Sequence, residues 1–295
     1  MSHTILSCCS TADLSREHFE RRDIRYICFH FRLNGQEYPD DLGESVSYKD
    51  FYAAMAKGAE TKTSQVNVSE YTSYFIRLLQ SGGDVLHVCL SSGLSGSYRS
   101  AMMAAATVAP AFPGQKLYVV DSLGASSGYG LLMELLADKR DEGMDIDSLR
   151  DFAESAKLRL HHWFFSTDLS YYFKGGRITR TEAWLGGVLD ICPLLNMNNE
   201  GKLIPRSKCR GKKRAIQEIV KSMEAHAEGG SDYSGKCFLS HSDCIDMAEA
   251  VAAFVEERFP RLNGKVLINS VGTTIGSHTG PGTVALFFLG DERGE

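Results

Sequence analysis

Segments rich in serine and glycine are the residues of this sequence that could bind a small anionic group. The densest is Ser91–Ser97, which holds four serines and two glycines in seven residues. Hydroxyls and backbone N–H groups at the start of a helix favour an anion. Serine is also a preferred N-cap residue, so a single such loop indicates only a helix start. Because Ser91–Ser97 carries more donors than one cap uses, we expect it to bind a ligand.

Three further polar segments are expected near the same place. They are Ser10–Asp13, Thr61–Gln65 and Asp121–Gly128. The first and third follow predicted strands, whereas Thr61–Gln65 precedes a predicted helix and has a less clear strand before it. Ligands of open α/β sheets bind outside the carboxyl ends of the strands. The order of these loops therefore predicts one shared binding site.

Cations are concentrated in two segments of the second half, Lys174–Arg177 and Lys208–Arg214. The glycine pair before Arg177 allows a tight turn that aims the guanidinium. The basic run could be a solvated helix start or a surface for a protein partner. Cations at a helix N-terminus oppose the helix dipole, however, which favours an anionic ligand.

The segment Ile275–Gly282 is the densest cluster of glycine and proline, and His278 is its one titratable residue. A lone histidine is usually structural. Loops with a restricted backbone often carry sites, so we interpret His278 as functional.

An alternative function is that of a serine hydrolase. Gly124–Gly128 matches the pattern GxSxG, with Ser126 as the nucleophile. The pattern is short, and Asp121–Leu123 separates it from the predicted strand. A Walker A motif and a GxGxxG fingerprint are absent, so no nucleotide site of its own is expected.

The composition describes an ordinary globular chain of 295 residues with a net charge of −5. The negative charge argues against nucleic-acid binding. Eight cysteines without a CxxC or a histidine-flanked spacing predict free thiols and no metal site. We find no signal peptide and no apolar run long enough to span a membrane, and expect a cytoplasmic protein.

Alternating strands and helices predict an α/β first half with a parallel sheet covered by helices on both faces. The predicted strands are Ile5–Cys9, Arg25–Phe31, Val85–Leu90 and Lys116–Val120. The predicted helices are Tyr48–Lys57, Glu70–Gln80 with Ser69 as its N-cap, Tyr98–Thr107 and Tyr129–Arg140.

The second half is predicted as a smaller α+β domain with a mixed sheet. Its predicted strands are Trp163–Phe165, Leu194–Met197, Leu203–Ser207, Cys237–Ser240, Val266–Asn269 and Val284–Leu289. Its predicted helices are Leu169–Phe173, Thr181–Leu189, Lys212–Ala227 and Met247–Arg258. We expect domains at residues 1–160 and 161–295, packed closely around a cleft.

Taken in order, these segments resemble the DegV family. The matching segments are Thr11–Leu14, Thr63–Gln65, Ser91–Gly96, Asp121–Ser122 with Gly128 and Gly130, Lys174–Arg177, Lys208 with Arg210, and Ile275–Gly282. The resemblance implies a non-catalytic protein without a cofactor, which holds a long-chain fatty acid such as palmitate in an interior tunnel of the first domain. It also implies a separate fatty-acid kinase as partner, which makes an acyl-phosphate for phospholipid synthesis. A transient membrane contact stays open.

The resemblance implies that the carboxylate lies at the domain junction. The residues expected around it are Thr63, Ser92, Arg177, Arg210 and His278. The residues expected to support these loops are Ser95, Gly96, Asp121, Ser122, Gly276 and Gly280.

Three departures from the family pattern bear on this expectation. Cys9 stands where many relatives have aspartate, Cys192 stands where lysine is common, and Val66–Val68 lacks the usual prolines.

The small and flexible residues of Ala101–Ala106 could line the tunnel, or could equally be a tightly packed core helix.

Overall fold

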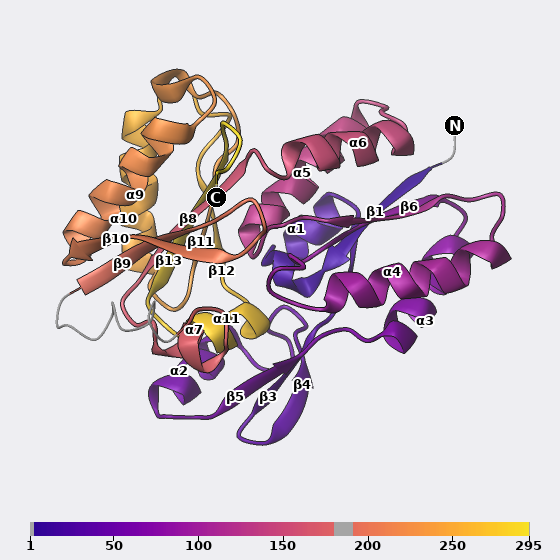
Figure 1. Cartoon of the computed structure of the whole chain (residues 1–295), viewed down its shortest axis with the longest axis horizontal. Coiled ribbons are helices and arrows are strands. Elements are labelled where there is room, and N and C mark those ends of the chain that lie inside the picture. The colour runs from indigo at the N-terminus through magenta and orange to yellow at the C-terminus, as the bar shows by residue number, and fades with distance from the viewer. Residues whose placement is uncertain (1–2, 180–190, 295) are drawn as a thin grey trace.

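The computed structural model describes residues 3–179 and 191–294, which form two main sheets and one small sheet (Figure 1). The first sheet is parallel, in the order β2-β1-β6-β7. Its strands are β1 (Thr4–Cys9), β2 (Ile24–Ile27), β6 (Asp84–Cys89) and β7 (Leu117–Asp121). Every residue of β1 and β6 is buried, as expected when helices cover both faces of a parallel sheet.

Helices pack on both faces of this sheet, which confirms the predicted class. In Figure 1, α3 and α4 lie on one side and α5 and α6 on the other. The helices of this part are α1 (Arg16–Arg21), α3 (Val68–Gln80), α4 (Ser97–Val108), α5 (Ser127–Asp141) and α6 (Ile146–Ala156).

The second sheet is mixed and has six strands in the order β10-β9-β8-β13-β11-β12. Its strands are β8 (Leu160–Ser166), β9 (Ile191–Met197), β10 (Leu203–Arg210), β11 (Phe238–His241), β12 (Leu267–Ser270) and β13 (Thr283–Leu289). Only the β11–β12 pair is parallel. Helices α9 (Lys212–His226) and α10 (Ile245–Arg258) pack together beside this sheet, which confirms the predicted mixed sheet with helices (Figure 1).

Helix α5 lies between the two main sheets. It contacts β1 of the first sheet and β8, β11 and β13 of the second. Its apolar side chains are buried around most of its circumference, as in a helix enclosed by protein.

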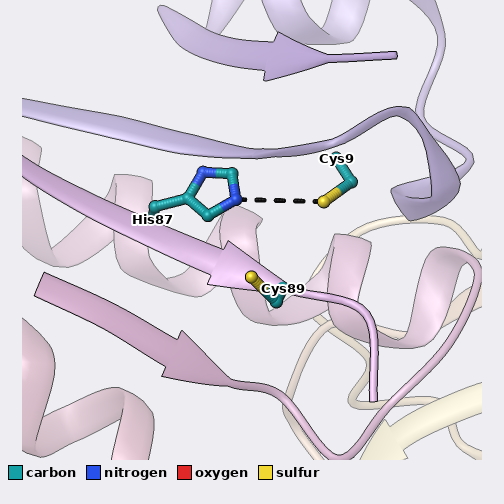
Figure 2. A group of neighbouring side chains, drawn as sticks. All are labelled: Cys9, His87 and Cys89. Atoms are coloured by element: carbon teal, nitrogen blue, oxygen red, sulfur yellow. Dashed lines mark hydrogen bonds between the residues drawn. The ribbon is translucent and has the colours of Figure 1, made fainter. Parts of the chain in front are cut away.

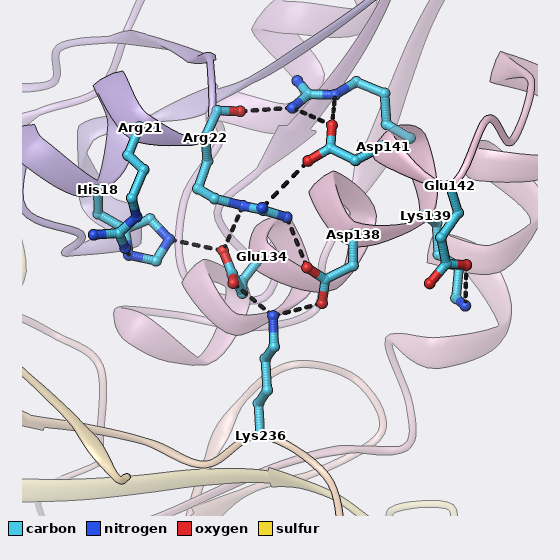
Figure 3. A network of polar contacts seen from close by, with 10 residues as sticks. His18, Arg21, Arg22, Glu134, Asp138, Lys139, Asp141, Glu142 and Lys236 are labelled. Atoms are coloured by element: carbon cyan, nitrogen blue, oxygen red, sulfur yellow. Dashed lines mark hydrogen bonds and ion pairs between the residues drawn. The ribbon is translucent and has the colours of Figure 1, made fainter. Parts of the chain in front are cut away.

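An ion-pair network also joins the two halves (Figure 3). Glu134 of α5 forms ion pairs with Arg22 at 3.0 Å and with Lys236 at 2.6 Å, and lies 3.0 Å from Nε2 of His18. Asp138 pairs with the same arginine and lysine. Burial raises the pKa of Glu134, but these donors outweigh it and lower the pKa to about 2. The carboxylate is therefore ionised at neutral pH and ties Lys236 to the first half.

A third, antiparallel sheet has the order β4-β3-β5, with strands β3 (His30–Leu33), β4 (Gln36–Pro39) and β5 (Thr61–Ser64). It packs against α11 (Thr273–Thr279), which also contacts α2 (Tyr48–Ala56) and α7 (Ser170–Lys174). The small sheet therefore brings an early segment of the chain beside a late one.

Two predictions about the first half were wrong because strands of the small sheet were not foreseen. The predicted strand Arg25–Phe31 is two strands, β2 and β3, which belong to different sheets. Thr61–Gln65 is not a loop, since Thr61–Ser64 pairs with β3. Helices α1 and α6 were also not predicted.

Two helices also differ from the prediction, one in where it begins and one in that it was predicted as a loop. Helix α3 begins at Val68, because Asn67 and not Ser69 is its N-cap and forms a capping box with Glu70. Residues Thr273–Thr279 form α11, although this stretch was predicted as a loop. Gly276 permits the helix to pack there, because a Cβ would overlap the Tyr52 hydroxyl.

The predicted helix Thr181–Leu189 lies outside the described residues. Across residues 3–179 and 191–294, no helix combines the length and apolar composition that a bilayer span requires.

Candidate functional site

A cavity of about 470 Å³ lies between the sheets and is lined from both halves of the chain. This volume falls within the range of about 300–1,000 Å³ typical of small-molecule sites. Its apolar wall comes largely from the second sheet and includes Phe164, Met197, Leu203, Ala285 and Phe287. The cavity thus has room for a mainly apolar ligand.

Strand alternation explains how β8 and β13 form this wall. Phe164 and Phe287 line the cavity, whereas Trp163 and Leu286 belong to the separate core under α9 and α10. Neighbouring residues of a strand point to opposite faces of the sheet. This period-2 signal was present in the sequence, but the wall residues were missed because both faces of these strands are apolar.

Thr63 and His278 form the polar centre of the cavity. The Thr63 hydroxyl on β5 lies 2.8 Å from Nε2 of His278 in the last turn of α11. The Nδ1 atom is buried and has no hydrogen-bond partner among the described residues. Burial, and then the charge of Arg177, lower the pKa of His278 to about 3. The imidazole is therefore neutral at physiological pH.

Arg177 lines the cavity beside this pair. The chain turns at Gly176, whose φ of +70° suits glycine, and the guanidinium then donates to the carbonyl oxygens of Leu94, at 3.1 Å, and Gly175. Burial lowers the pKa of Arg177, but an arginine stays charged at neutral pH. No carboxylate in residues 3–179 or 191–294 forms an ion pair with it, so a cation faces the cavity without an anion.

The predicted residues fall into two groups. Thr63, Ser95, Gly96, Arg177 and His278 line the cavity. The predicted residues outside the described lining are Ser92, Asp121, Ser122, Arg210, Gly276 and Gly280.

The residues outside the lining mostly shape the elements around it. The backbone N–H of Ser92 donates to Asp121 at 3.1 Å, and the Ser92 residue itself is exposed. Ser122 is buried within its own turn, where its hydroxyl donates to the carbonyl of Gly124. Gly280 ends α11 with a φ of +66°, and a Cβ there would overlap Tyr171.

Arg210 is exposed at the end of β10. The basic run continues into α9, where Arg214 pairs with Glu218 at 2.7 Å across one helical turn. This pair fits the alternative of a solvated helix start.

Of the two alternatives for the alanine-rich segment, the structure fits the packed core helix, and none of Ala101–Ala106 lines the described cavity. Ala101, Ala104 and Ala105 are buried where α4 packs against β6, β7 and α3. Met102 and Met103 point outward and are 44% and 53% exposed.

Ser126 has contacts that do not fit a hydrolase. Its hydroxyl donates to Asp13 and lies 3.0 Å from Oγ of Ser240. The nearby His162 accepts from the backbone N–H of Ala125 at Nε2, at 3.2 Å, and its Nδ1 is bonded to a carbonyl. The described residues therefore hold no histidine bonded to Ser126 that could take its proton.

The cavity between the two main sheets defines a ligand-binding protein whose pocket has a largely apolar wall and a cationic side chain, Arg177, among its polar groups. A family model described as "Uncharacterised protein, DegV family COG1307" matches residues 9–291. The chain belongs to the DegV family, which confirms the resemblance read from the motifs.

Known relatives cover nearly the whole chain. A DegV domain-containing protein of Clostridium perfringens is 33% identical over 284 residues, which are 96% of each protein. A DegV family protein from Thermus thermophilus, described as binding fatty acid, superposes with a TM-score of 0.86 at 27% identity, covering 98% of this chain and 100% of its own. A Thermotoga maritima protein with a described fatty-acid-binding function has a TM-score of 0.84 at 25% identity, covering 98% and 100%.

Proposed function

We propose that this protein binds a long-chain fatty acid, with the carboxylate at Thr63, Arg177 and His278 and the acyl chain along the apolar wall. The observation that carries the proposal is the Arg177 guanidinium, which faces an apolar cavity without a carboxylate partner in the described chain. Arg177 is half-buried, and a charge that is partly removed from water is costly unless it is paired. The carboxylate of a fatty acid supplies that partner, and the fatty-acid binding described for the Thermus and Thermotoga proteins supports this choice.

The acyl chain and the carboxylate of such a ligand contribute differently to its binding affinity. Burial of a methylene is worth about 0.8 kcal/mol, so about fourteen methylenes give roughly 10 kcal/mol before ordering costs. A hydrogen bond to a charged group adds about 1.5–3 kcal/mol. The acyl chain would therefore dominate the affinity, and the polar residues would fix the orientation of the acid.

A separate fatty-acid kinase is the proposed partner, and the protein itself is proposed to carry the acid without a cofactor and without reacting with it. The fatty acid kinase (Fak) B3 protein of Streptococcus pneumoniae, described as loaded with linoleic acid, shares this fold with a TM-score of 0.83 at 19% identity. Ser92 and Arg210, which are exposed outside the lining, remain proposed contacts of the head group.

The proposed domains are residues 1–160 and 161–295. The described strands of the parallel sheet end by Asp121, and those of the mixed sheet begin at Leu160. A cytoplasmic location is proposed because Cys8, Cys9, Cys28, Cys89, Cys209, Cys237 and Cys244 are free thiols, as is usual in reducing compartments.

The decisive experiment identifies the small molecule that the purified protein carries. Native mass spectrometry of protein from a heterologous host is expected to show one bound long-chain fatty acid, with a thermal shift when palmitate is added to delipidated protein. Apo protein that palmitate does not stabilise would reject the proposal.

A further inference from the structure

Three side chains with metal-binding atoms meet inside the first half, at the ends of two neighbouring strands (Figure 2). Cys9 ends β1, Cys89 ends β6, and His87 precedes Cys89 by two positions on the same face. The pairing of Cys8 with Val88 in the parallel register brings Cys9 beside Cys89. Nε2 of His87 lies 3.8 Å from Sγ of Cys9, and the three ligand atoms all lie within 4.8 Å of one another.

The imidazole is held with Nε2 towards the sulfur atoms. Its Nδ1 lies 2.9 Å from the Ser7 hydroxyl, which lies 2.7 Å from the Tyr74 hydroxyl. When Nδ1 donates to the Ser7 hydroxyl, the Nε2 lone pair faces Cys9. Metal-bound histidines are oriented by a hydrogen bond of this kind at their other nitrogen.

The group is also enclosed by the protein. Cys9, His87 and Cys89 are all fully buried. Their three ligand atoms lie close enough together to hold one ion, and cysteine and histidine are side chains that Zn²⁺ prefers.

We propose that Cys9, His87 and Cys89 bind one Zn²⁺ ion. Two thiolates balance the charge of the ion, and the two thiol protons are released to solvent when it binds. Zn–S bonds of about 2.3 Å and Zn–N bonds of about 2.0–2.1 Å place tetrahedral S and N ligands about 3.6 Å apart, close to the observed separation. The Tyr71 hydroxyl, 3.2 Å from Sγ of Cys9 and 4.0 Å from Sγ of Cys89, lies beside the group as a further oxygen.

A second group of potential ligands is less suited to a metal and serves as a comparison. Asp291 lies 2.9 Å from Nε2 of His161 and 3.2 Å from Nδ1 of His226. The two imidazole rings are stacked, with centroids 5.0 Å apart and planes 20° apart. The nitrogen lone pairs of stacked rings lie in nearly parallel planes and do not converge on one ion.

The test loads the full chain with metal during refolding, because the buried group is accessible before the sheet closes. Wild-type protein is unfolded in guanidinium chloride with a chelator present to remove bound metal. It is then refolded with Zn²⁺, passed through a desalting column and analysed for bound metal. We expect one Zn²⁺ per chain in the wild type and in Cys8→Ala, and less than one-tenth of that in Cys9→Ala. Cys8 is a matched control because it is equally buried on the opposite face of β1.

Refolding with Co²⁺ gives a readout that needs no variant. Thiolate coordination to Co²⁺ produces an intense charge-transfer absorption, which we expect in the wild type. Its absence overturns the proposal even if Cys9→Ala fails to fold. Zinc that is retained in Cys9→Ala and lost in His226→Ala also overturns it, as does a Cys9–Cys89 disulfide in protein refolded under reducing conditions.

Discussion

Thr63 and His278 are separated by 215 positions in the chain, yet the threonine hydroxyl and the imidazole Nε2 lie 2.8 Å apart. The contact exists because the small sheet carries β5 to α11, a helix from the other end of the sequence. This pair and Arg177 all line the cavity, and the first predictions concern them.

Loss of the Thr63 hydroxyl should weaken fatty-acid binding about tenfold, the value of one ordinary hydrogen bond of about 1–1.5 kcal/mol. We expect this for Thr63→Val, measured by calorimetry with palmitate. Thr61→Val on the same strand, outside the described lining, is the control. An equal loss of affinity for palmitate in the two variants would contradict a direct role for Thr63.

Arg177→Gln should lower the affinity for palmitate by about 10- to 100-fold, because it removes a charge-assisted contact worth about 1.5–3 kcal/mol. The affinity for hexadecanol, which lacks the carboxylate, should change little. Arg210→Gln should lower the affinity less than Arg177→Gln does, since Arg210 is a proposed head-group contact that is exposed outside the described lining. A larger loss of affinity in Arg210→Gln than in Arg177→Gln would show that Arg210, and not Arg177, is the main cation that contacts the carboxylate.

Filling the apolar wall should change the preferred chain length. Ala285→Leu adds volume on the cavity face of β13, so we expect weaker binding of the longest acids and nearly unchanged binding of shorter ones. Competition among saturated acids of different lengths measures this. A uniform loss across the series would indicate that the acyl chain lies elsewhere.

The ion-pair network predicts a specific dependence of stability on pH. The pKa of Glu134 is lowered to about 2 in the folded protein from 4.5 in the unfolded chain. Its contribution to the free energy of unfolding is therefore complete above pH 4.5 and is lost as the pH falls towards 2. Glu134→Gln should destabilise the protein by about 1–3 kcal/mol at pH 7, and by less near pH 3.

Chemical denaturation at several pH values measures this difference. If Glu134→Gln lowers the free energy of unfolding by the same amount at pH 7 and at pH 3, the charge of Glu134 is not the cause of the destabilisation. Glu142, whose carboxylate pairs with Lys139 on the surface of the protein, supplies a matched control in Glu142→Gln.

Ser126 should not react with a fluorophosphonate probe, because no histidine in the described part of the chain is bonded to its hydroxyl. Gel fluorescence of the wild type and Ser126→Ala checks this. Labelling that disappears in the variant would restore the hydrolase alternative.

Local patterns in the sequence were sufficient to predict the two main sheets. The apolar runs of β1, β6 and β7 and the neighbouring strands β9 and β10 were predicted to within a few residues of their observed positions. The small sheet was missed because its strands are short and mostly polar, as the exposed residues of β4 illustrate. Such strands are stabilised by pairing and by α11, which no local pattern reveals.

The polar residues of the cavity were easier to predict than its wall. Thr63, Arg177 and His278 belong to polar and glycine-rich motifs that stand out in a sequence. Phe164 and Ala285 look like ordinary core residues, since the cavity they line exists only after the second sheet has packed against α5.

The position of α5 restricts how a ligand could be exchanged. A wide hinge motion that parted the two sheets would strip the helix from one of them, expose Leu132 and Met133 to water, and break the contacts of Lys236. Such a hinge motion would cost free energy because it exposes buried apolar surface to water. Uptake and release of the acid are therefore expected to need only small, local displacements around the pocket mouth, while the two sheets stay in place.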